Sequence, residues 1–108
     1  MSDRMVEREV WIGLVEVAPE EGNNMFEGAL GAYVNVLALA SSVEDYMAVT
    51  APALLHRGLI AVGVDDPEPL RERQAKFQLR DEIVQLGEQA QTGEVVWDRF
   101  HSFESEED

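Results

Sequence analysis

Residues Val10–Val17 have the sequence Val-Trp-Ile-Gly-Leu-Val-Glu-Val. This stretch is almost continuously apolar and rich in β-branched residues, which is typical of a strand buried on both faces or nearly so. The turn cluster Pro19–Asn24 follows it, because Pro cannot continue a ladder and Gly and Asn tolerate positive φ. A second strand is predicted over Ala32–Ala40, and we expect it to pair antiparallel with the first across this turn.

The first helix is predicted from Val43 to Arg57. Ser41-Ser42 precedes Glu44-Asp45 at the spacing of a capping box, in which a hydroxyl and a carboxylate each accept a backbone N–H. Pro52 should kink the helix, because it removes one amide hydrogen bond. The side chains expected on one face are Val43, Tyr46, Met47, Thr50 and Leu54.

Gly58 is a natural helix stop, and a third, core strand is predicted over Leu59–Val64. The following stretch, Asp65–Pro69, should break that strand and open a second helical region. Asp66 is expected to cap this helix, with prolines accepted in its first turn.

The second helical region contains a short helix over Leu70–Lys76 and then a longer one. The longer helix is indicated by Leu79, Ile83, Leu86 and Ala90, which recur at helical spacing. Gly93 ends it, and the last strand is predicted over Glu94–Phe103.

The element order is therefore strand, strand, helix, strand, helix, strand. It predicts an α+β fold: a two-layer sandwich with a mixed four-stranded sheet and both helices on one face. We expect one domain over residues 1–103. The tail, 104–108, has four acids in five residues and is predicted to be a disordered, solvating end.

The chain is strongly acidic, with 22 Asp and Glu against 8 Lys and Arg in 108 residues and a net charge of -14. Nucleic-acid binding and anionic membrane surfaces are disfavoured, because both need Lys and Arg. A partly basic protein or a cation is electrostatically allowed. The chain has no Cys, no signal-like N-terminal segment and no apolar run near 18 residues, so we expect a cytoplasmic protein.

Three carboxylates, Asp65, Asp66 and Glu68, lie within four residues at the expected end of a strand. Such positions often hold ligands, and these acids could gather a hard cation such as Mg²⁺ or Ca²⁺. We favour the alternative, in which they are the acids of a helix start, and therefore predict no metal.

The last strand offers a second candidate surface, because Trp97, Arg99 and His101 alternate on one face. An exposed strip of this kind would suit a protein interface. We favour the alternative that Trp97 and Phe103 pack under the helices, with His101 at the margin of the core. Asn35, within an apolar strand, is either edge-facing or a buried polar group that needs partners.

Three stretches resemble a family of small uncharacterised bacterial proteins: Gly31-Ala32-Tyr33-Val34-Asn35-Val36, Asp65-Asp66-Pro67-Glu68-Pro69-Leu70 and Gly93-Glu94-Val95-Val96. The resemblance implies a compact α+β domain. It implies no activity, no cofactor and no catalytic residue.

The sequence contains no convincing catalytic set, and from Glu9 to His56 it has seven acids and no Lys or Arg. We therefore expect a non-catalytic protein-interaction or regulatory module whose acidic surface favours a partly basic partner. The alternative is a small ligand-binding protein or enzyme with a site near the ends of the central strands, formed by Asp65, Asp66, His101, Asn35 or Arg99. Homodimerisation is compatible with both, and we predict no cofactor.

Overall fold

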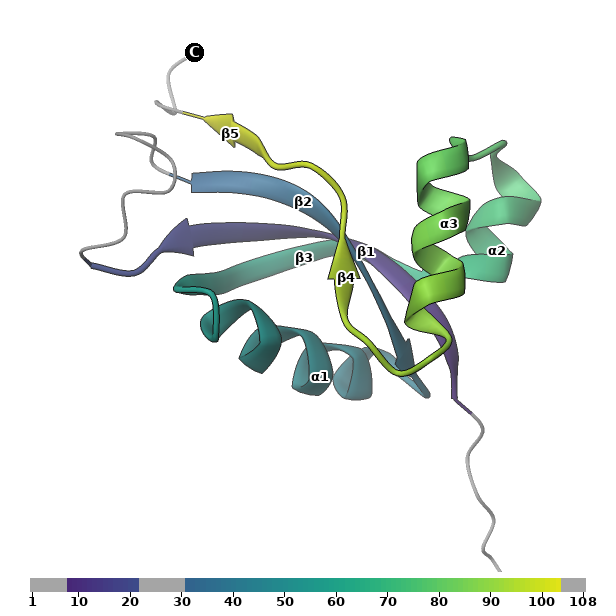
Figure 1. Cartoon of the computed structure of the whole chain (residues 1–108), viewed down its shortest axis with the longest axis horizontal. Helices are drawn as coiled ribbons and strands as arrows, with labels where there is room; N and C mark the ends of the chain where they lie inside the picture. The colour runs from purple at the N-terminus through teal and green to yellow at the C-terminus, as the bar shows by residue number, and fades with distance from the viewer. Residues whose placement is uncertain (1–7, 22–30, 104–108) are drawn as a thin grey trace, which may run out of the picture.

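The computed structural model describes residues 8–21 and 31–103, with side chains given up to residue 100. The elements are β1 (Glu9–Pro19), β2 (Gly31–Ala40), α1 (Val43–Leu55), β3 (Leu59–Pro69), α2 (Leu70–Lys76), α3 (Asp81–Ala90), β4 (Val96–Trp97) and β5 (His101–Phe103). The strands form one sheet in the order β3-β1-β2-β4, and β5 also pairs with β2 (Figure 1). The predicted α+β class is confirmed. The proposed tail, 104–108, lies outside the described residues.

Every strand pair described in the sheet is antiparallel, so the prediction of a mixed sheet was wrong. The expected hairpin of β1 and β2 is present. After α1, however, the chain passes beyond β2 and forms β3 on the far side of β1. Because β1 separates β2 from β3, these two strands run in the same direction without being neighbours.

The helices cover both faces of the sheet, whereas the sequence had suggested one face. On β1, Val15 and Val17 pack with Leu54 of α1 in one hydrophobic cluster. On the other face, Val10 and Ile12 pack with α2 and α3 in a second cluster, which includes Leu70, Ile83 and Ala90. Figure 1 shows α1 apart from the α2–α3 pair, across the strands. Cover on two faces explains why β1 is apolar at nearly every position.

The N-terminus of α1 forms much as its sequence predicted. The Asp45 amide donates to Ser42 Oγ over 3.0 Å, and Asp45 Oδ2 accepts from the Ser41 amide over 2.9 Å. The hydrogen bond from the Ser41 amide is the main reason that the pKa of Asp45 lies below its usual value. The helix ends at Leu55 rather than Arg57. Of the expected inward residues, Tyr46, Thr50 and Leu54 are buried, while Val43 is 44% exposed.

Tyr46 fastens α1 to the sheet. Its side chain is fully buried, and its hydroxyl donates to the carbonyl oxygen of Val36 over 2.7 Å. Burial raises its pKa far above the usual value. The ring lies against Gly13, where a Cβ would come within 3.0 Å of the hydroxyl oxygen. A larger residue at this point of β1 would therefore require Tyr46 or Val64 to move.

Two predicted boundaries were wrong. β3 continues through Asp65–Pro69 to the start of α2, so these residues belong to a strand and not to a helix start. Asp66 does not cap α2, because Pro69 occupies the N-cap position and no side chain bonds there. The expected last strand is two short strands, β4 and β5, separated by residues 98–100. The short helix over Leu70–Lys76 is confirmed as α2.

Candidate functional site

β3 is an edge strand of the sheet, although the sequence had suggested a core strand. Within 8–21 and 31–103, its only strand partner is β1. Leu59 is buried against α1, but Ile60 is 46% and Val62 is 58% exposed. A register shift between β1 and β3 leaves Val62 without a partner residue on β1. Such bulges re-aim side chains at sheet edges.

β3 carries no basic residue along its whole length, and exposed acids lie near both of its ends. Asp65 and Asp66 are exposed near the C-terminal end. At the other end, the amide of Glu20 donates to the carbonyl oxygen of Gly58 over 2.9 Å, so exposed Glu20 lies beside the start of β3. Arg57 is also exposed there, with its guanidinium 5.6 Å from the centroid of the Trp97 ring.

A groove of about 870 Å³ lies beside the C-terminal half of β3. It brings together four of the residues that the sequence singled out: Asn35, Asp65, Asp66 and Glu68. The sheet register explains this, because Leu14 of β1 lies between Asn35 of β2 and Asp65 of β3. The other residues that line the groove are Leu14, Pro67, Arg73, Lys76, Phe77 and Leu79.

Glu68 is engaged by basic groups of α2. Arg73 Nε and Lys76 Nζ both donate to its carboxylate, the lysine over 2.6 Å. These hydrogen bonds, that of Arg73 first, hold the pKa of Glu68 below its usual value. Arg73 also donates to the backbone oxygen of Asp66 over 2.8 Å. Glu68 thus ties β3 to α2.

Asp66 and its neighbours do not form a cation site in this structure. Asp66 has a left-handed backbone, with φ 51°. Asp tolerates this conformation better than most residues do. In the described part of the chain, no three His, Cys, Asp or Glu side chains are arranged to hold a metal ion.

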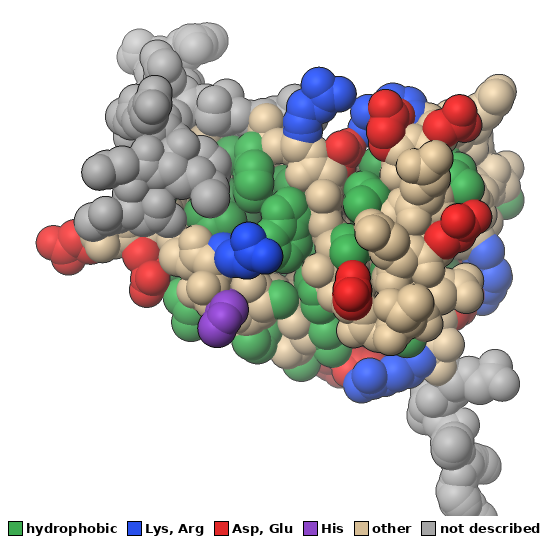
Figure 2. All heavy atoms as spheres, viewed as in Figure 1, with side chains coloured by type: hydrophobic (Ala, Val, Ile, Leu, Met, Phe, Trp, Pro, Cys, Tyr) green, Lys and Arg blue, Asp and Glu red, His purple; other side chains and the backbone are tan. Residues whose placement is uncertain are grey.

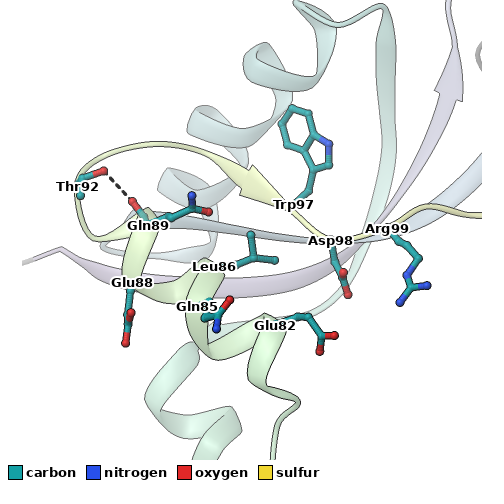
Figure 3. A pocket seen from close by; sticks show the side chains of 9 residues that line it. All are labelled: Glu82, Gln85, Leu86, Glu88, Gln89, Thr92, Trp97, Asp98 and Arg99. Carbon is teal, nitrogen blue, oxygen red and sulfur yellow. Dashed lines mark hydrogen bonds between the residues drawn. The ribbon is translucent and has the colours of Figure 1, made fainter.

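A second groove of about 820 Å³ lies between α3 and the segment that follows β4 (Figure 3). Trp97 and Arg99 line it together with Glu82, Gln85, Leu86, Glu88, Gln89, Thr92 and Asp98. Figure 2 shows acidic side chains over α3 and hydrophobic ones over the strands to its left. Asp98 accepts from Arg80 Nη2. Burial opposes ionisation of Asp98, but the Arg99 amide and Arg80 outweigh it and lower its pKa.

The strip of Trp97, Arg99 and His101 is divided in the structure. Trp97 is half-buried and packs against the cluster under α1, whereas Arg99 is exposed. The strand alternation on which the strip depended ends after Trp97. His101 begins β5, and its side chain lies outside the described part of the structure.

The exposed edge of β3 was missed in the sequence. Its apolar residues indicated a core strand, and only Asp65–Pro69 marked an unusual end. Comparison of the chain with models of known protein families, with curated proteins and with solved structures returned no match. None of the helices in the described ranges is long and apolar enough to cross a membrane.

Proposed function

We propose that this protein is a non-catalytic protein-interaction module that binds an extended segment of a partner along β3. The observation that supports this is the exposure of Ile60 and Val62 on an edge strand. Edge strands present unpaired backbone groups to other chains, and peptides commonly bind by adding a strand there. Natural proteins often block such edges with Lys or Pro. β3 has no Lys, and its two prolines, Pro67 and Pro69, stand only at its end.

Site-specific photocrosslinking tests this proposal. A benzophenone amino acid replaces Val62 in the full chain. The variant is expressed in cells of the native host, and these cells are irradiated. The matched control carries the same amino acid at Val43, an apolar residue of α1 that is 44% exposed. We expect a defined protein adduct from position 62 that is absent from position 43 and is lost when Ile60→Lys is added. Equal adduct patterns from the two positions would contradict the proposal.

A second candidate function is supported by the groove at Asn35. It is lined by the amide of Asn35, the exposed carboxylates of Asp65 and Asp66, the exposed ring of Phe77 and the apolar side chain of Leu14. Such a mixture is common in small-molecule sites. Native mass spectrometry of the protein purified from its own cells tests this function. A bound small molecule that is lost in Asn35→Ala and retained in Val62→Lys would favour ligand binding over the interaction module.

A further inference from the structure

In the part of the chain that the structure describes, the edge of β3 that faces away from β1 has a defined length and charge pattern. It extends from Leu59 to Asp65, because Asp66 has a left-handed backbone and its carbonyl oxygen already accepts from Arg73. Seven residues in extended conformation span about 23 Å. Exposed Ile60 and Val62 lie within this length, Asp65 and Asp66 lie at one end, and Glu20 lies beside the other.

We propose that the partner of β3 is an extended segment with apolar residues at its centre and Lys or Arg at both ends. The inference rests on the proposed function and specifies the chemistry of the partner. Apolar side chains of the segment would cover Ile60 and Val62. Its basic ends would lie near Asp65 and Asp66 on one side and near Glu20 on the other.

The same charge pattern argues against a second copy of this chain as the occupant. If two β3 strands paired antiparallel, Asp65 and Asp66 of each copy would lie opposite the end of the other copy where Glu20 is exposed. If they paired parallel, Asp65 and Asp66 would meet their own equivalents. Opposed like charges destabilise a strand pair, and each chain already carries a net charge of -14. Arg57 offsets part of this negative charge at one end, and Arg73, which donates to the backbone oxygen of Asp66, offsets part of it at the other.

Synthetic peptides of nine residues test the inference. Three peptides share a central Thr-Val-Thr-Val-Thr segment and carry two Lys, two Gln or two Glu at each end. Binding to the full chain is measured by NMR titration up to millimolar peptide, at low and high salt. We expect the Lys peptide to bind about ten-fold more tightly than the Gln peptide at low salt, because its Lys side chains would lie near three exposed acids, Asp65, Asp66 and Glu20. This difference should shrink at high salt.

Variants identify the groups that are responsible. Asp65→Asn combined with Asp66→Asn should weaken the Lys peptide several-fold and leave the Gln peptide unchanged. The matched control is Glu44→Gln with Glu88→Gln, which removes two exposed acids from α1 and α3. This control should bind like the wild type. Val62→Lys should abolish binding of both the Lys and Gln peptides.

The outcomes separate this inference from the proposed function. Equal binding of the Lys and Gln peptides, lost in Val62→Lys, would overturn the inference and leave the interaction module standing. Absence of any Val62-dependent binding would overturn the inference. The proposed function would then be tested separately by the crosslinking experiment. A dimer in sedimentation analysis that Val62→Lys dissociates would identify a second copy as the occupant and would also overturn the inference.

Discussion

Gly13 determines how closely α1 approaches the sheet, and Gly13→Ala tests that role. A Cβ at this position would lie 2.9 Å from Cγ2 of Val64 and 3.0 Å from Oη of Tyr46. Overpacking of a buried site costs roughly 1–3 kcal/mol. Loss of glycine flexibility in a strand returns about 0.5–1 kcal/mol. We therefore expect Gly13→Ala to lower the free energy of unfolding by about 1 kcal/mol, within a range of about 0–2.5 kcal/mol.

Gly63 is the matched control, because it lies on the neighbouring strand with no atom within 4 Å of an added Cβ. Gly63→Ala should leave the protein unchanged or stabilise it by about 0.5–1 kcal/mol. Urea unfolding followed by circular dichroism measures both variants through the transition midpoint, provided that the slope stays constant. If Gly13→Ala is as stable as Gly63→Ala, the proposed close packing of Gly13 is refuted.

A double-mutant cycle with Tyr46→Phe resolves the source of the effect. Tyr46→Phe alone should cost about 1 kcal/mol, because the buried hydroxyl donates to the carbonyl oxygen of Val36. In the Phe background the contact with Oη no longer exists, so Gly13→Ala should be less costly by about 0.5 kcal/mol or more. Additive effects would show that the hydroxyl does not contribute to the close contact.

Three further predictions concern other parts of the fold. Ser42→Ala removes the acceptor for the Asp45 amide and should cost about 1 kcal/mol of unfolding free energy by urea titration, whereas Ser42→Asp should retain most of it. Trp97→Glu should cost about 2 kcal/mol or more, because the ring packs under α1, and a fully stable variant in the same titration would show that it does not. Asp98 has a lowered pKa in the folded state, so its stabilising contribution is present above pH about 4 and is lost as the pH falls below that value. Asp98→Asn should therefore reduce the pH dependence of the urea midpoint in this range.

Local signals in the sequence predicted the elements that depend on near neighbours. β1 and β2 follow from apolar, β-branched runs, and α1 begins where the hydroxyl of Ser42 accepts the Asp45 amide. The α2 helix was found as a separate short piece. Element order alone could not show on which side of β1 the chain would place β3. That choice is made by packing between residues far apart in the sequence, and the prediction of a mixed sheet was therefore wrong.

The groove at Asn35 also depends partly on residues close along the chain and partly on contacts between residues far apart in the sequence. The sequence marked Asp65, Asp66 and Glu68 because they are close along the chain, and their meeting with Asn35 depends on the register of β1 with both neighbours. The sequence could not show that Glu68 would be paired with Arg73 and Lys76, since these basic residues come from the next helix. Their helical positions only become relevant once α2 folds back toward β3.

The number of apolar positions in a strand indicates how many of its faces pack against other elements. Val10–Val17 is apolar at nearly every position, and the structure covers both faces of β1 with helices, as such a sequence requires. A sheet with both helices on one face was therefore inconsistent with this stretch from the beginning. The same reasoning applies to β3, in which Leu59 and Ala61 pack under α1 while Ile60 and Val62 remain exposed in the described part of the chain. The partner segment that we propose would give β3 a second neighbour beside its exposed apolar residues, and the acids near the ends of β3 favour basic residues at the ends of that segment.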